Sequence, residues 1–137
     1  MELTTKQFKE KVLQSDTPVL VECWASWCLP CKQIEASLKR LKEEYAGRCE
    51  VYKINIDRNP VISRDYTVKG LPTVMTFWNG SELERKVGSI SDNDLKELAE
   101  RVIASSAENN AATEDTDMSE EEEQKIIEQR LKDLNYM

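Results

Sequence analysis

The sequence predicts an α/β fold in which a central mixed β-sheet is flanked by helices on both faces. Segments with helical periodicity alternate with short apolar segments in the order α-β-α-β-α-β-β-α. The nearly continuous apolar run at residues 19–25 is typical of a strand buried on both faces. An Asn-Gly pair at residues 79–80 is a strong hairpin signal, so we expect the last two strands to be antiparallel.

The first helix and the first strand each have a local signal. Thr4 and Gln7 form a predicted capping box, and apolar residues at helical spacing follow them. Pro18 closes this helical region, and the strand at residues 19–25 comes directly after it.

The middle of the chain predicts a helix, a strand and a short helix. The helix covers residues 30–45 and stops at Gly47. Its apolar side consists of Ile34, Leu38, Leu41 and Tyr45. Residues 51–56 alternate as a strand does, and a short helix opens at Asn59-Pro60 and reaches about Tyr66.

A hairpin and a helix complete the pattern. Residues 73–78 and 82–87 are the two strands of the hairpin. The polar run at residues 91–94 then caps a last helix. The apolar face of that helix consists of Leu95, Leu98, Val102 and Ile103.

The composition changes near Ala104 and divides the chain into three parts. Residues 1–104 carry 16 Lys or Arg and 16 Asp or Glu, so the whole net charge of −7 lies in residues 105–137. Residues 105–118 have little apolar content and predict an acidic, flexible linker. Residues 119–137 begin with a capping box and predict an amphipathic helix. The apolar side of that helix consists of Ile127, Leu131 and Leu134.

This C-terminal helix has two interpretations. It packs back on its own domain or self-associates, which we favour, or it recruits another protein through its apolar side. A helix of this length is only marginally stable alone in water. In both interpretations it folds against a protein surface, either its own domain or another protein.

The composition excludes several classes of function. The first domain has no surplus of basic residues for nucleic acid, and no apolar run approaches the roughly 20 residues of a membrane-spanning helix. The chain has no histidine, so it has no histidine base or histidine metal ligand. Residues 1–6 lack the apolar core of a secretory signal, and we therefore expect a cytoplasmic protein.

Cys28 and Cys31 lie at the junction of a buried strand and a helix. Their spacing allows a disulfide across one turn, and the helix N-terminus favours a thiolate at Cys28. Pro30 suits the first turn of a helix, because a backbone N–H at that position would have no hydrogen-bond partner within the helix. The alternatives are a structural disulfide or half of a zinc site, but a zinc site needs a second ligand pair, and Cys23 and Cys49 are isolated. The pattern favours a redox-active pair and predicts neither a metal nor a cofactor.

The chain resembles thioredoxins over residues 4–104. The shared landmarks are WCLPCK at residues 27–32, KINID at residues 53–57, GLPT at residues 70–73 and Val87-Gly88 before the last helix. The resemblance implies the thioredoxin fold and reversible dithiol–disulfide exchange with protein substrates.

The resemblance also implies a role for each matching residue. Cys28 becomes the attacking thiolate that opens a substrate disulfide, and Cys31 resolves the mixed disulfide. Pro72 matches the family's cis-proline, and the backbone of Leu71 beside it pairs with an extended substrate. An ordinary turn proline is the less favoured alternative. The apolar rim that contacts substrate consists of Trp27, Leu71 and Gly88.

Glu22 is a lone acid in the buried strand at residues 19–25, and burial is expected to raise the pKa of its carboxyl. Thioredoxins have an aspartate at the matching place, which implies that Glu22 moves the proton of Cys31. Lys53 matches the lysine near that acid, so partnership with Lys53 is the alternative role of Glu22. Both roles can hold together.

Leu29 departs from the family, because thioredoxins usually have glycine at this place. In the family, the two residues between the cysteines tune the redox poise of the pair, which implies this role for Leu29 and Pro30. Leu29 also adds apolar bulk at the mouth of the site, where it can change the choice of partner.

We therefore predict a thiol-disulfide oxidoreductase that reduces disulfides in protein substrates and is recharged by a thioredoxin-reductase-type donor. The alternatives are a disulfide oxidase or isomerase, a glutaredoxin-like enzyme, and a non-catalytic binding module on the same fold. The presence of both cysteines and of Pro72 disfavours the binding module. Cys23 is expected to be a small core residue and Cys49 to be exposed near a strand start, with no redox role favoured for either.

Overall fold

The structure is a computed structural model that describes the backbone of residues 1–118 and the side chains of residues 1–107. The helix predicted at residues 119–137 lies outside the described residues. The chain divides into two compact units, Met1–Ala104 and Ser105–Met137.

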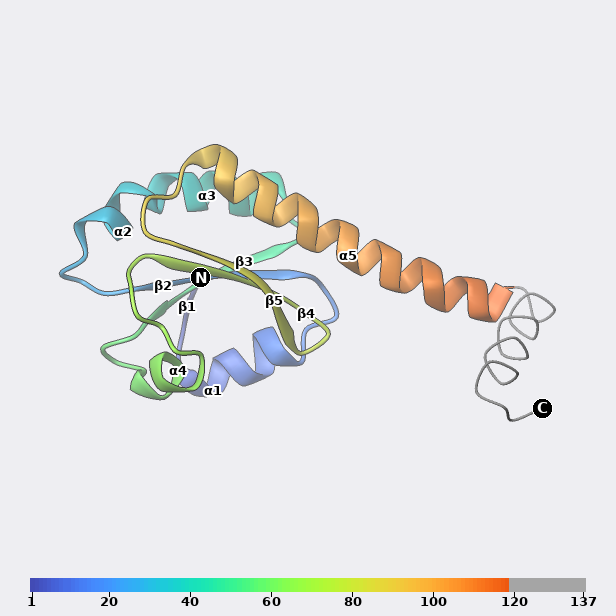
Figure 1. Ribbon diagram of the computed structural model, residues 1–137, viewed down its shortest axis with the longest axis horizontal. Helices are drawn as coiled ribbons and strands as arrows, with labels where there is room; N and C mark the ends of the chain where they lie inside the picture. Colours follow the sequence, from blue (N-terminus) through green and yellow to red (C-terminus); the bar gives the residue numbers. More distant parts are fainter. Residues whose placement is uncertain (119–137) are drawn as a thin grey trace. The chain divides into compact units, whose positions relative to one another are not determined.

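A five-stranded mixed sheet forms the centre of the first unit (Figure 1). The strands are β1 (Glu2–Leu3), β2 (Val19–Trp24), β3 (Glu50–Asn55), β4 (Thr73–Trp78) and β5 (Ser81–Val87). They lie in the order β1-β3-β2-β4-β5, with β1, β3 and β2 parallel, and with β4 antiparallel to both β2 and β5. The last four strands were predicted. Strand β1 was missed because two residues are too few for an alternating pattern to show.

Helices cover both faces of this sheet, as predicted. They are α1 (Thr5–Phe8), which continues as the π-helix η1 (Lys9–Leu13), then α2 (Leu29–Gln33), α3 (Glu35–Glu44), α4 (Pro60–Asp65) and α5 (Asp92–Met118). Within the first unit, α3 and the part of α5 up to Ala104 lie on one face, and α1 and α4 lie on the other (Figure 1).

The predicted start and turn signals are confirmed. The Thr4 hydroxyl accepts a hydrogen bond from the Gln7 N–H at 3.2 Å, and the Gln7 side chain accepts one from the Thr4 N–H at 3.0 Å. Ser91 caps α5 through the Asp94 N–H at 3.1 Å. Asn79 and Gly80 have φ values of 56° and 82°, the positive values that a tight two-residue hairpin requires.

The single helix predicted over residues 30–45 is wrong, because the structure has two helices that meet at Ile34. Ile34 has φ −97° and ψ 1°, outside the helical range, and this interrupts the helical hydrogen-bond ladder. Its carbonyl still accepts a hydrogen bond from the Leu38 N–H at 2.9 Å. Neither proline nor glycine occupies the break, so nothing in the local sequence marks it.

Helix α5 continues past the predicted end of the last helix. Residues 105–118, for which the sequence predicts a flexible linker, have helical backbone in α5. The division of the chain into a domain, a linker and a C-terminal helix stays a prediction.

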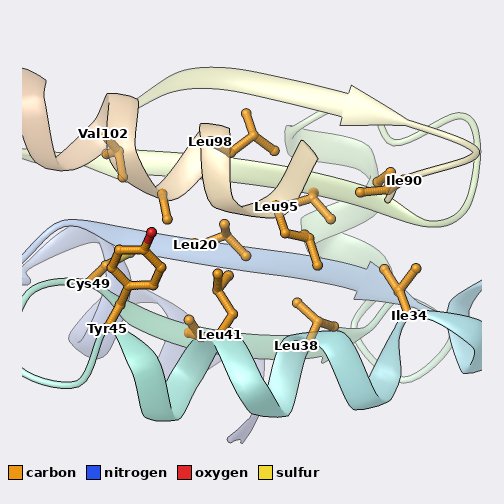
Figure 2. Packing of buried hydrophobic residues seen from close by; sticks show 13 residues of the cluster. Leu20, Ile34, Leu38, Leu41, Tyr45, Cys49, Ile90, Leu95, Leu98 and Val102 are labelled. Carbon is orange, nitrogen blue, oxygen red and sulfur yellow. The ribbon is translucent and has the colours of Figure 1, made fainter. Parts of the chain in front are cut away.

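Two apolar clusters fill the space between the sheet and the helices of the first unit. One lies against α3 and α5, where the predicted apolar side of residues 30–45 faces Leu20 of β2 and Leu95 of α5 (Figure 2). The other contains Phe8, Phe77 and, at its edge, Tyr66, whose rings pack edge to face with centroids 5.4 to 5.5 Å apart. Strand β2 separates the two clusters and is buried on both faces, as predicted.

Leu38→Ala is expected to lower the free energy of unfolding by about 2–5 kcal/mol, because the Leu38 side chain is fully buried against β2. Urea unfolding measures the loss. Lys39→Ala, one residue further along the same helix and exposed, is the control and is expected to change stability by less than about 0.5 kcal/mol. Equal losses in the two variants would contradict this description of the core.

Candidate active site

Strand β2 and helix α2 place the two cysteines. Cys28 is the N-cap of α2, Pro30 lies in the first turn, and Cys28 and Cys31 form a disulfide. The Cys31 N–H points at the Cys28 sulfur, with 3.1 Å between the two atoms. An N–H directed at this sulfur, together with the partial positive charge at a helix N-terminus, stabilises a thiolate at Cys28 once the disulfide is reduced.

Two large apolar side chains are exposed on either side of Cys28. Trp27 is 68% exposed and Leu29 is 65% exposed, while the two disulfide-bonded cysteines are only 3% exposed each. The Trp27 indole N–H donates a hydrogen bond to Asp57 at 2.8 Å, which fixes the ring beside the disulfide. Exposed apolar side chains next to a reactive group are typical of a contact surface for another molecule.

The Leu71–Pro72 peptide bond is cis, the form that the resemblance predicts. The Pro72 carbonyl accepts a hydrogen bond from the Gly88 N–H at 2.9 Å. The backbone N–H and C=O of Leu71 form no hydrogen bond with any other described residue. A groove of about 350 Å³ has Pro30, Leu71 and Gly88 among its lining residues. The structure thus brings Leu71 and Gly88 beside the cysteine-bearing helix, and Trp27 lies outside the lining of the groove.

Glu22 is fully buried in the middle of β2, and neither of its carboxyl oxygens has a hydrogen-bond partner within the described residues. Burial raises the pKa of the Glu22 carboxyl from its ordinary value of 4.5 to about 8, although the charge of Lys53 acts in the opposite direction. The predicted rise is confirmed. Near neutral pH the Glu22 carboxyl is therefore mostly protonated.

Lys53 lies directly across from Glu22 in the pairing of β2 with β3, but it forms its ion pair elsewhere. Its Nζ lies 3.3 Å from Oε1 of Glu35 and 4.4 Å from the centre of the Trp24 ring. The predicted partnership of Lys53 with Glu22 is therefore not an ion pair. Lys53 acts on Glu22 through its charge, which opposes the effect of burial on the pKa.

Glu22 and Cys31 line the same cavity of about 310 Å³. The other lining residues are Trp24, Lys32, Glu35 and Lys53. Four of the six lining residues are Glu or Lys, and the cavity is large enough to hold water. It therefore offers a route for a proton between the buried carboxyl and the second cysteine.

A sequence model of the family described as "Thioredoxin" matches residues 1–101. A thioredoxin of Rickettsia felis is 40% identical over 101 residues, which cover 74% of this chain and 96% of that protein. A thioredoxin of Rickettsia bellii is 42% identical over 95 residues, which cover 69% of this chain and 90% of that protein. Thioredoxin 1 of Nostoc sp. is 35% identical over 100 residues, which cover 73% of this chain and 94% of that protein.

The chain belongs to the thioredoxin family. Its mixed sheet with flanking helices is the thioredoxin fold. Family membership and the Cys28–Cys31 pair make the protein a thiol-disulfide oxidoreductase. Membership of the thioredoxin family implies protein disulfides as substrates and, in general, a reductase as partner.

The other two cysteines of the chain are buried and form no disulfide. Burial raises the pKa of each thiol, Cys23 and Cys49, to about 12, so neither forms a reactive thiolate near neutral pH. The predicted exposure of Cys49 is wrong. Its side chain packs beside Tyr45 in the cluster between the sheet and α3, because the chain turns directly from the end of that helix into β3 (Figure 2).

Sequence reasoning missed Asp57, which holds Trp27, and Glu35, which holds Lys53. Asp57 lies 30 residues from Trp27 and Glu35 lies 18 residues from Lys53, so no local spacing signals either pair. Within the described residues, no group of three or more His, Cys, Asp or Glu side chains could hold a metal ion. In the same part of the chain, no helix is long and apolar enough to cross a membrane.

Glu22 is expected to make the stability of the oxidised protein fall as the pH rises. The folded protein keeps a proton on Glu22 up to about pH 8, whereas the unfolded chain loses it near 4.5. The stabilisation is fully present below pH 4.5 and is lost as the pH rises towards 8, by up to about 1.4 kcal/mol per pH unit.

Urea unfolding of the wild type and of Glu22→Gln between pH 5 and pH 8 measures this effect. The stability of the variant relative to the wild type is expected to increase steadily over that range. Glu43→Gln, which changes an exposed carboxylate on α3, is the control and should show no such trend. A constant difference between the wild type and Glu22→Gln would contradict the burial of a protonated carboxyl.

Proposed function

We propose that this protein works as a reductase of disulfides in other proteins, with Cys28 as the nucleophile and Cys31 as the resolving thiol. The observation that supports this most is the position of Cys28, at the N-terminus of α2 between exposed apolar side chains. A thiolate stabilised there is nucleophilic near neutral pH, and the apolar surroundings suit a protein substrate.

In the first step, the Cys28 thiolate attacks one sulfur of the substrate disulfide. A mixed disulfide forms, and the other substrate sulfur leaves as a thiolate that takes a proton from solvent. In the second step, Cys31 loses its proton and attacks the Cys28 sulfur. The Cys28–Cys31 bond forms, the second substrate sulfur leaves, and two electrons have passed from the dithiol to the substrate.

Glu22 carries the proton of Cys31 in this scheme. Its carboxylate accepts the proton when Cys31 attacks, and its protonated form returns a proton to Cys31 when the disulfide is reduced again. Two observations support this role: both residues line one cavity, and the Glu22 pKa of about 8 lies close to neutral pH. Lys53 adjusts the balance of the two forms through its charge.

Substrate binding uses the groove beside Pro72 and the exposed rim. The unpaired backbone groups of Leu71 bind an extended substrate segment as an added strand, and Trp27, Leu29 and Gly88 supply contacts around it. Leu29 and Pro30, between the cysteines, also tune the redox poise. The exposure of Leu29 supports a part in the choice of substrate.

A thioredoxin-reductase-type donor restores the dithiol after each turnover. Such a cycle runs in a compartment that keeps thiols reduced, so we place it in the cytoplasm. The amphipathic helix predicted at residues 119–137 is proposed to dock on its own domain or on another protein, with support from its sequence pattern alone.

Cys31→Ser is expected to accumulate a covalent mixed disulfide with a disulfide-containing peptide, because nothing displaces the peptide from Cys28. Cys28→Ser is expected to form no adduct and to lose at least about 10³-fold in the rate of peptide disulfide reduction. Mass spectrometry of the adduct and a steady-state assay with dithiothreitol as electron donor measure the two effects.

Cys49→Ala is the control, because Cys49 is buried away from the site, and its rate of disulfide reduction should match the wild type. Equal adduct formation by Cys28→Ser and Cys31→Ser would overturn the assignment of the nucleophile.

A further inference from the structure

The ammonium group of Lys53 forms its ion pair with Glu35 and not with the buried acid that faces it across the sheet. Lys53 and Glu22 are opposite each other in the pairing of β2 with β3. The ion pair of Lys53 is nevertheless with Glu35 on α3, at 3.3 Å, and both Glu22 oxygens are left without a hydrogen bond among the described residues.

We infer that Glu35 is a positioning residue of the active site, whose carboxylate holds the Lys53 ammonium at the exposed side of the cavity, away from the Glu22 carboxyl. The side chain of Glu35 is 54% exposed, that of Lys53 is 13% exposed, and Glu22 is fully buried. The three side chains therefore lead from solvent to the interior, with Lys53 drawn towards the solvent end. This inference rests on the proposed function of Glu22.

A second contact holds Lys53 in the same place. Its ammonium lies 4.4 Å from the centre of the Trp24 ring, a cation–π distance. The indole N–H of Trp24 donates to both carboxylate oxygens of Glu2 at 3.0 Å, which fixes the ring. Glu35 and Trp24 together account for the position of Lys53.

Four elements contribute charged groups to the surroundings of Glu22. Lys53 on β3 favours the ionised carboxylate, whereas Glu35 on α3 and Glu2 on β1 favour the protonated form. Lys32 on α2 lines the same cavity. Glu35 is the carboxylate with which Lys53 forms an ion pair among the described residues.

Burial sets the direction of the Glu22 pKa shift, and the position of Lys53 changes the balance between the two forms of Glu22 near neutral pH. An ammonium paired directly with the carboxylate would stabilise the ionised form and leave no proton to return to Cys31. With Lys53 held by Glu35, the protonated form remains populated. Glu35 thereby acts on the Cys31 proton through Lys53, without touching either cysteine.

The test is the titration midpoint of the Glu22 side-chain carboxyl, followed by ¹³C NMR in the oxidised full-length chain. Glu35→Gln is expected to lower the midpoint by at least about one pH unit, because Lys53 is released towards Glu22. Lys53→Met is expected to raise the midpoint. In the double variant, Glu35→Gln should lower it far less than it does when Lys53 is present.

Glu44→Gln is the matched control. Glu44 is also on α3 and also forms an exposed ion pair, with Lys96 at 3.8 Å, so its loss should leave the Glu22 midpoint unchanged. An unchanged midpoint in Glu35→Gln would overturn the inference. So would an equal fall with and without Lys53, since Glu35 would then act by its own charge alone.

The oxidised protein titrates without substrate, so this result is separate from the proposed function. The pH profile of mixed-disulfide resolution by Cys31, measured in Glu35→Gln, tests the function. If the NMR midpoint falls and the pH profile of resolution stays in place, Glu35 positions Lys53 but Glu22 does not carry the Cys31 proton.

Discussion

The burial of one unpaired carboxyl group in the central strand is the constraint to which the rest of the site is adjusted. Glu22 lies in β2 between two apolar clusters, where ionisation is costly and the protonated form is favoured. The core that forces this state on Glu22 also fixes the direction of β2, which leads the chain to Cys28. Fold stability and redox chemistry therefore depend on the same strand.

Features set by neighbouring residues could be predicted from the sequence, and features set by distant contacts could not. The capping box at Thr4 and the helix start at Cys28 each depend on a few adjacent residues, and both were found. The burial of Cys49 and the ion pair of Lys53 depend on packing between separate elements, and no residue near Ile34 marks the break between α2 and α3. The buried acid was found because a charge within an apolar strand is itself a local signal.

Substrate contact and proton transfer use two different regions next to the same disulfide. The groove beside Leu71 and the cavity beside Glu22 have no lining residue in common. Leu29 and Trp27 project into solvent, whereas Lys53 is largely covered. A substitution in the exposed rim can therefore alter which protein binds without altering Glu22, the acid that exchanges a proton with Cys31.

The reduction potential of the Cys28–Cys31 pair tests most directly whether this protein reduces its substrates. It is measured by equilibration in thiol–disulfide buffers, with the fluorescence of Trp24 and Trp27 as the signal. A reductase requires a strongly reducing value, near the roughly −270 mV typical of thioredoxin. A value near −120 mV, as in a strong disulfide oxidant, would contradict the reductase assignment and make Leu29 the first residue to examine.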